Sequence, residues 1–376
     1  MGYQNVGKPR FFIDNYQYLR TMGLDPEAYM EGDIPDDWEG ALFNESSGYK
    51  TIFENPNAFI LDPIQSKRFN VDTYGSFLSF LIPMGNQVQN MDFSGNMKWY
   101  CAILNHDIPY TISQMSFNIA PQSGQINSDF SYTNVLNAER NIINQKGSSI
   151  FYTDLTPTGD DINENIKRYT GFILLNDGAH NFINIGAISM GVMYTMPHSP
   201  DLELTMEIEN DGYKSVTTQG GSTLTNINFT GAPNWTNGGQ FINPFGVGDY
   251  SDNSYLDGSK RNGRRTWNLT FSYISDKDLF SSNYMANNYT ETTTDYDSDD
   301  IDTENQFEYN MFTDDSFVAQ VWNKSGALGL PFIFQPDSSN NNPDQFCLAQ
   351  FDQKSLKISQ DAYQAYSISV KVGEIW

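Results

Sequence analysis

The sequence is poor in cysteine, histidine and basic residues. Its 376 residues include 2 cysteines and 3 histidines, and 21 lysines and arginines stand against 46 acidic residues. The net charge of −25 argues against nucleic acid as a main partner and against an anionic membrane surface, because both attract basic faces. No apolar run approaches the roughly 18 residues that a membrane-spanning helix needs. The opening stretch MGYQNVGKPRFF lacks the apolar core of a secretory signal.

The scarcity of sulfur and imidazole groups removes the commoner metal and catalytic sites. Cys101 and Cys347 show no ligand spacing, and we expect buried free thiols in a chain made in a reducing cytoplasm. His106, His180 and His198 are scattered, whereas a zinc site needs several nitrogen or sulfur donors together. The sequence has no GxSxG turn, phosphate-binding glycine loop or CxxC pair. We therefore expect no catalytic residue, no metal and no cofactor.

Aromatic and turn-forming residues, in contrast, are plentiful. Aromatic side chains make up 14% of the chain, with 29 glycines and 16 prolines. This composition favours strands joined by turns, and the length suggests two domains. We predict a mainly β protein with two antiparallel β-sandwich domains, at 71–194 and 195–376, the second with a single lateral α-helix. Residues 1–70 are predicted to be an N-terminal arm, with a short helix or a segment docking on a neighbour over 11–24 and irregular chain over 25–70.

Within the first predicted sandwich, short apolar or alternating runs are separated by turn-rich loops, which is typical of such domains. The long polar stretch 121–166 is predicted to form loops. The predicted strands lie at 76–84, 98–106, 112–120, 171–177 and 183–194.

The second predicted domain has clearer strand patterns. LELTMEIE (202–209) alternates strictly, with four apolar side chains on one face and polar ones on the other, which predicts a strand with one face in solvent. TWNLTFSYI repeats the alternation, with four side chains predicted to point inward. A helix is predicted over 314–325, capped by Thr313 or Asp314 and ended by Gly326, and strands at 330–334 and 365–376 close the domain. The apolar positions of the first two strands are Leu202, Leu204, Met206 and Ile208, and Trp267, Leu269, Phe271 and Tyr273.

The order of features in this half follows a recognisable plan: an early strand containing a DG pair at 211–212, a basic pair before a tryptophan-centred strand, a helix, a proline-led aromatic strand, and a last strand with an acid–apolar ending. The residues concerned are Arg264, Arg265 and Trp267, then Pro331, Phe332 and Phe334, then Glu374, Ile375 and Trp376. In this order the chain from 196 to 376 resembles the minor tail and distal tail proteins of long-tailed bacteriophages. The acidic insertion at 281–305 is longer than in that family, and the N-terminal half, with AILNH and INIGAISMG, resembles galectin- or discoidin-like sandwiches.

This resemblance implies a structural protein of the virion and no enzyme. Such proteins form a homo-oligomeric ring, commonly a hexamer, that joins the tail tube to the tip or baseplate after synthesis in the cytoplasm of the bacterial host. Its implied partners are further copies of itself and the tube, hub and fibre proteins of the tail. The N-terminal domain would decorate the outside of the ring, where it would hold fibres or contact a host surface glycan.

Four cations ahead of the tryptophan-centred strand are the candidate assembly residues. They are Lys260, Arg261, Arg264 and Arg265. In a ring each interface joins two different patches, so a basic patch on one copy would meet an acidic one on the next, here Asp295, Asp297, Asp299 and Asp300. The alternative interpretation is a solvated turn that keeps a sheet edge soluble.

Two other functions remain open from the residues alone. Trp235, in the turn-rich APNWTNGG, is the candidate exposed aromatic and would stack on a sugar ring or on a neighbouring subunit. This permits a carbohydrate-binding β-sandwich protein for attachment to a host surface. A cell-wall hydrolase would require an acid pair in a cleft, and the pair Glu207 and Glu209 is predicted to lie on a solvent-facing strand face.

Overall fold

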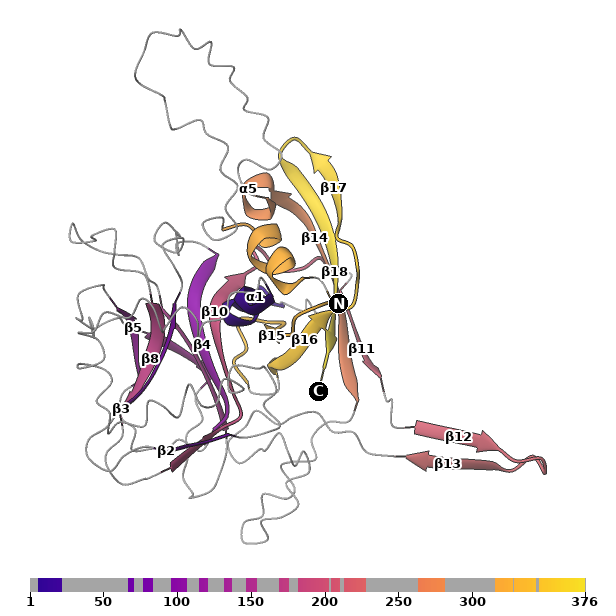
Figure 1. Ribbon diagram of the computed structural model, residues 1–376. Helices are drawn as coiled ribbons and strands as arrows, with labels where there is room; N and C mark the ends of the chain where they lie inside the picture. Colours follow the sequence, from indigo (N-terminus) through magenta and orange to yellow (C-terminus); the bar gives the residue numbers. More distant parts are fainter. Residues whose placement is uncertain are drawn as a thin grey trace.

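The computed structural model describes fifteen stretches of the chain and confirms the predicted mainly β class with antiparallel sheets (Figure 1). The stretches are 6–21, 67–70, 77–83, 96–106, 115–120, 132–136, 147–153, 169–175, 182–202, 204–209, 213–227, 263–280, 315–326, 328–342 and 345–375.

The strands that match sequence predictions are β3 (Phe77–Pro83), β4 (Met97–His106), β5 (Met115–Ala120), β8 (Tyr169–Leu175), β9 (Phe182–Ile185), β10 (Ala187–Thr195), β11 (Thr205–Glu209), β14 (Arg264–Ser275), β15 (Phe332–Gln335) and β18 (Ala365–Glu374). Strand β12 (Tyr213–Thr217) also matches, because it lies at the early strand predicted around the DG pair. The strands that the sequence patterns did not predict are β1 (Arg10–Asp14), β2 (Lys67–Asn70), β6 (Tyr132–Leu136), β7 (Gly147–Thr153), β13 (Thr223–Ile227), β16 (Cys347–Phe351) and β17 (Lys357–Ala362). The helical segments are α1 (Asn15–Thr21), α5 (Asp276–Leu279) and the π-helix η5 (Val318–Asn323).

Eleven of the described strands form one sheet that spans the whole sequence. Its order is β11-β14-β18-β16-β15-β1-β10-β4-β7-β6, and β17 pairs with β18. The sheet crosses the domain boundary predicted near residue 195, because β10 and β15, from the two sides of that boundary, both pair with β1. The smaller sheets are β12-β13, β2-β9 and β3-β8-β5.

Strand β1 corrects the expectation for the N-terminal segment. The sequence suggested a helix or an arm over 11–24, but in the described part of that range residues 10–14 are strand and 15–21 are helical. The reason is that RFFID is apolar on both sides. Phe11 and Ile13 enter one core, and Phe12 enters the core on the opposite face. A strand buried on both faces has a continuous apolar run instead of an alternating pattern.

The larger core lies on the face of the sheet that carries the helical segments. In Figure 1, α5 and the orange η5 segment lie between β10 on one side and β14 with β18 on the other. Phe317 and Val321 are fully buried there, and the Tyr194 hydroxyl donates to the Asp278 carbonyl at 3.0 Å. The sheet therefore bends around one core. The core strands contribute Phe11, Trp267, Leu269, Phe271, Phe332, Phe334, Phe351, Ile368, Val370 and Val372.

A helical segment is present where the helix near 314–325 was predicted, at residues 317–325, but Val318–Asn323 are π-helical and α5 is a second helical segment in this half of the chain, so the expected single α-helix is corrected. Its start differs from the prediction in detail. Thr313 and Asp314 lie outside the described residues, and Ser316 Oγ accepts a hydrogen bond from the Ala319 amide at 3.3 Å, as an N-cap side chain does. Gly326 ends the segment with a φ of 58°, as predicted from the sequence.

The stretch 121–166, predicted to be loops, contains two strands of the large sheet. β7 pairs with β4 over Trp99–Thr153 to His106–Gly147, and β6 pairs with β7. The described part of β7 is buried from Ser148 to Phe151, although its sequence GSSIFYT begins with small polar residues. Ser148 and Ser149 can be buried because they hydrogen-bond to Asn105 and His106 of β4. The sequence of β7 therefore lacks the alternation of apolar and polar residues from which the other strands were predicted.

Candidate self-assembly interface

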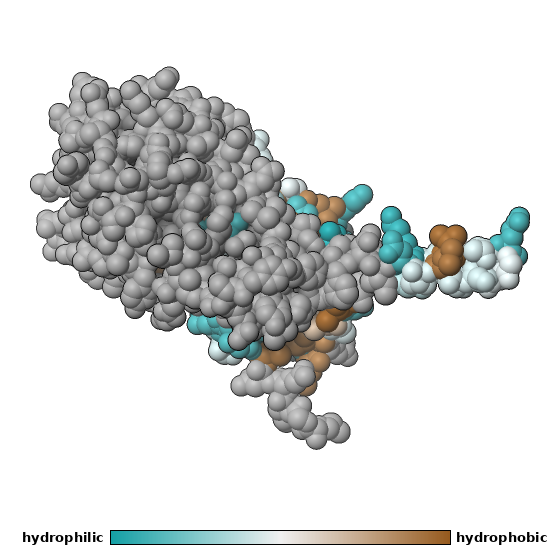
Figure 2. Space-filling model, turned by 90° about the horizontal axis from the view of Figure 1, so that it is seen from below, coloured by the Kyte–Doolittle hydropathy of each residue, from teal (hydrophilic) through white to brown (hydrophobic). Residues whose placement is uncertain are grey.

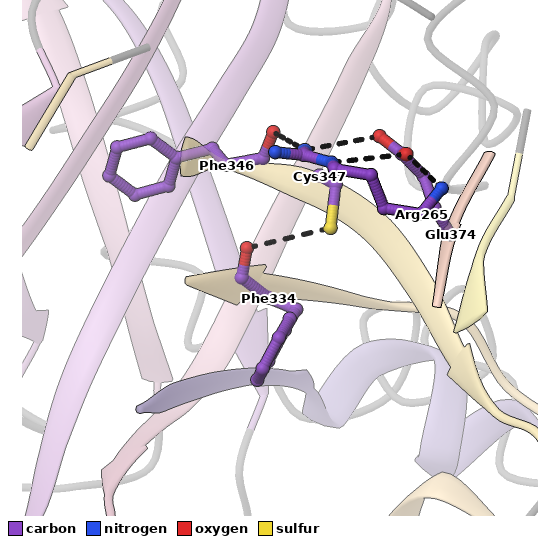
Figure 3. Close-up of polar contacts among 5 residues, drawn as sticks. All are labelled: Arg265, Phe334, Phe346, Cys347 and Glu374. Atoms are coloured by element: carbon purple, nitrogen blue, oxygen red, sulfur yellow. Dashed lines mark hydrogen bonds and ion pairs between the residues drawn. The ribbon is translucent and has the colours of Figure 1, made fainter. Parts of the chain in front are cut away.

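Arg265 lies in a buried ion pair within the chain and not on the surface (Figure 3). Its Nη2 and Nε donate to the two carboxylate oxygens of Glu374 at 3.2 and 3.3 Å, and the Glu374 Oε2 also accepts from the Arg265 amide at 3.0 Å. A further bond runs from Nη2 to the Phe346 carbonyl at 3.5 Å, and the guanidinium lies 4.9 Å from the Trp267 ring. The surface role predicted for Arg265 is therefore corrected, because its carboxylate partner belongs to the same chain.

Of the other charged residues predicted at the interface, the structure describes Arg264 alone. Arg264 lies opposite Glu209 in the β11–β14 ladder, where opposite charges on one face favour each other. Lys260 and Arg261 lie outside the described residues, and so do Trp235 and the acidic run. That run comprises Asp295, Asp297, Asp299 and Asp300.

Strand β11 has the alternation predicted from the sequence, but the exposure of its apolar face was not predicted. Its alternation is as predicted, since Met206 lies opposite Trp267 and Ile208 opposite Arg265, on the side of the larger core. The apolar face is nevertheless uncovered. Leu204 packs against the core, whereas Leu202 is 81% exposed and Met206 and Ile208 are each 51% exposed. Strand β11 also ends the large sheet, so its outer backbone edge has no strand partner among the described elements.

The hairpin that follows β11 stands apart from the large sheet. Figure 1 and Figure 2 both show β12 and β13 projecting from the body. Val216 and Leu224 lie directly opposite each other and are 65% and 63% exposed. Thr218 and Ser222 close the turn through the bond from the Thr218 amide to the Ser222 carbonyl at 2.9 Å.

The two faces of this hairpin differ in chemistry. Val216 and Leu224 share one face with Lys214 and Asn226. The other face carries hydroxyl groups, and hydrogen bonds from Ser215 and Thr225 lower the pKa of Tyr213. On this face Tyr213 therefore shares hydrogen bonds with Ser215 and Thr225. The hydroxyl-bearing residues of that face are Tyr213, Ser215, Thr217, Thr223 and Thr225.

A second exposed apolar group lies at the opposite end of strand β14. Tyr273 was predicted to point inward, but a β-bulge between Phe271 and Ile274 turns it out, and its ring is 73% exposed with a backbone φ of 62°. Ile274 takes the buried position. Tyr363, in the β17–β18 turn, is 86% exposed. The two residues belong to one corner, because the Asp276 amide donates to the Gln364 carbonyl at 3.2 Å.

Ionisable groups on the outer face of β18 are solvated. Lys371 Nζ lies 2.5 Å from Asp352 Oδ2, with both side chains well exposed. The hydrogen bond and charge of Asp352, with smaller contributions from Glu207 and Glu209, raise the pKa of Lys371. Glu207 and Glu209 are exposed, as predicted. An exposed carboxylate pair beside a lysine lacks the enclosed arrangement that glycoside hydrolysis needs.

Buried polar groups lie around β4 and β10, and their hydrogen bonds indicate a structural role. The Tyr100 hydroxyl and Ser189 Oγ are 2.7 Å apart, and His106 Nε2 lies 2.9 Å from Ser149 Oγ. Burial, followed by the charge of Asp14, raises the pKa of Tyr100 and that of Cys101 well above their ordinary values. Cys101 and Cys347 form no disulfide and are both buried, as predicted. A protonated, enclosed thiol is a poor nucleophile.

The described ranges contain no group of three or more His, Cys, Asp or Glu side chains arranged to hold a metal ion. None of the helices in these same ranges has the length and apolar character to cross a membrane. A scan against family models and searches of curated proteins and of solved structures found no match to this chain.

Proposed function

We propose that the protein is a self-assembling structural component of a bacteriophage tail, a ring-forming adaptor that joins the tail tube to the tip, baseplate or fibres. The observation that carries this proposal is the uncovered apolar face of β11, the last strand of the large sheet, on the side of the larger core. The order of motifs between residues 196 and 376 supports the placement in a tail.

An exposed apolar strand at a sheet edge favours association with another protein. Edge strands normally carry charges or bulges that block pairing, and contiguous exposed apolar side chains mark interaction sites. Here Met206 and Ile208 occupy an edge strand whose other face carries carboxylates. A chain of net charge −25 repels its own copies at long range, so only such local contacts can hold copies together.

The test is the mass and shape of the purified full-length protein in solution. Sedimentation velocity and negative-stain electron microscopy should show closed homo-oligomers with a central opening. A single monomeric species at every concentration would contradict the proposal. Aspartate at Met206 and Ile208 should reduce association while leaving the near-ultraviolet circular dichroism of the core unchanged.

A second candidate function, glycan binding, is favoured by the tyrosine corner. A bulky residue at positive φ is strained, and Tyr273 retains this backbone although it is exposed, at the corner of the fold that also carries the exposed Tyr363. Aromatic rings with adjacent polar groups form stacking platforms. Asparagine tolerates this backbone better, so Tyr273→Asn should leave stability unchanged or slightly higher and should abolish retention on a glycan array. If Tyr273→Asn were retained on the array as well as the wild type, glycan binding at the tyrosine corner would be contradicted.

A further inference from the structure

We propose that the β12–β13 hairpin of one copy packs its apolar face on the β11 strand of a second copy. The inference rests on the proposed function, because it names the contact through which copies associate. Its two surfaces are the hairpin face with Val216 and Leu224 and the edge face with Met206 and Ile208.

The hairpin requires a partner on physical grounds. A lone two-stranded hairpin is at best marginally stable in water, because it has no apolar core to bury. All described side chains of β12 are exposed, and Leu224 on β13 is exposed as well. Of its two faces, the hydroxyl face already bonds Tyr213 to Ser215 and Thr225. The face with Val216 and Leu224 is therefore the one that gains from burial against a partner.

The geometry of the chain points to a neighbouring copy as the occupant. Three residues, 210–212, connect β11 to β12, and the hairpin then projects away from the body (Figure 1). It therefore leaves the β11 face of its own chain exposed. A second copy presents the same two surfaces. One contact repeated head to tail therefore buries the apolar face of each hairpin against the β11 face of the next copy.

Charge also favours another copy over a different acidic partner site. Residues 213–227 contain one lysine and no aspartate or glutamate, in a chain with 46 acidic residues. Because the hairpin has no carboxylates, it can approach an acidic second copy without local repulsion between carboxylates. On β11, Glu207 and Glu209 lie on the face opposite Met206 and Ile208, so the apolar face that receives the hairpin carries neither carboxylate.

The experiment compares two hairpin variants that carry the same added charge on opposite faces. Val216→Asp with Leu224→Asp places two carboxylates on the docking face. Thr217→Asp with Thr223→Asp, the adjacent cross-strand pair, places them on the hydroxyl face. The first pair should weaken self-association about 100-fold or more in sedimentation equilibrium, because two aliphatic side chains lose their burial. The matched control should assemble within a few-fold of the wild type.

Mixing gives a second readout that does not depend on loss of assembly. The Val216→Asp/Leu224→Asp copy keeps an intact edge, and a Met206→Asp/Ile208→Asp copy keeps an intact hairpin. Each alone should be monomeric, and an equimolar mixture should form 1:1 dimers, since one junction is restored and both free ends are blocked.

The outcomes separate this contact from the proposed function. If the wild type assembles and the docking-face variant assembles equally well, or if the mixture stays monomeric, the hairpin contact is wrong and self-assembly stands. If the wild type is monomeric throughout, the proposed function fails and the contact fails with it. A docking-face defect with an intact control and restored dimers supports the inference.

Discussion

The side chain of Arg265 holds the C-terminal end of the chain in place. The ladder of β14 and β18 begins at the pair Thr266 and Gly373, and the ion pair to Glu374 lies just beyond it. Both side chains are almost fully buried, so each charge depends on the other for compensation. A bidentate guanidinium also fixes the geometry in a way that a lysine would not.

Replacing Arg265 by alanine should lower the free energy of unfolding by about 3–5 kcal/mol, because Glu374 is left buried without a partner. Urea denaturation followed by tryptophan fluorescence measures the change. The control is Lys371→Ala, which removes a cation from the exposed pair with Asp352 and should cost less than about 1 kcal/mol. Equal effects of the two substitutions would show that the Arg265 pair is not buried.

The protonation of Tyr100 and Cys101 gives a second prediction at this scale. Burial raises both pKa values, so the folded state keeps both protons where the unfolded chain releases them. Their contribution to stability is therefore fully present below the unfolded pKa values and is lost as the pH rises through about 8.5 for the thiol and about 10 for the phenol.

The expected loss is up to about 1.4 kcal/mol per pH unit for each group. Urea denaturation at pH 8 to 11 measures it, and the combined change Tyr100→Phe with Ser189→Ala should remove the phenol's part of the slope without leaving a buried hydroxyl unpaired. An unchanged slope would mean that Tyr100 ionises in the folded protein.

At the scale of the elements, the close contact between β1 and β10 depends on Gly191. A Cβ atom at this position would lie 2.1 Å from the Ile13 carbonyl oxygen and 2.7 Å from the Asn15 nitrogen. Backbone atoms cannot move aside as a flexible side chain can, so any side chain here forces β1 away from its neighbour.

Gly191→Ala should therefore destabilise the protein by at least about 2 kcal/mol, in the range of overpacked cores. Thermal unfolding by circular dichroism measures the effect. Gly373→Ala is the matched control in another strand of the same sheet, since its nearest contact would be the Asp352 Cβ at a comfortable 3.8 Å. A control that unfolds as early as the Gly191 variant would remove the steric explanation.

Strands with a local signal were predictable from the sequence. The alternation in β14 and β18 and the apolar runs of β3 and β4 fixed those elements. Strand β1 was missed because a strand buried on both faces lacks alternation, and the outward turn of Tyr273 depends on a bulge that only the pairing with β18 defines. The order of strands in the sheet depends on pairings between distant residues, which no local pattern contains.

The candidate interface was predictable only where it depends on local sequence. The sequence identified the apolar face of β11, but whether anything covers that face depends on the rest of the fold. The basic residues indicated an interface, but the partner of Arg265 is Glu374, which lies 109 positions away. A cluster of like charges in sequence therefore separated into one buried and one partly exposed arginine in space.

At the scale of the whole molecule, the net charge opposes assembly while local contacts promote it. Copies that carry −25 each repel one another over a distance of about 30 Å at 10 mM salt and about 8 Å at 150 mM salt. Raising the salt concentration should therefore strengthen self-association, because screening removes the repulsion and leaves apolar contacts intact.

Sedimentation velocity across a salt series measures this dependence. The control is the Val216→Asp/Leu224→Asp protein, which should stay monomeric at all salt concentrations. Weaker association of the wild type at high salt would indicate that ion pairs, such as those first predicted for the basic residues, hold the copies together instead.

The central position of β1 has a consequence for biosynthesis. The hydrogen-bond partner of Arg10, Gln335, is translated 325 residues after it. Until β10 and then β15 have been translated, the N-terminal phenylalanines have no strands to shield them. The apolar β1 segment of the nascent chain therefore stays exposed until those strands follow, and expressing residues 1–195 and 196–376 separately would deprive the second piece of the strand that pairs with β15.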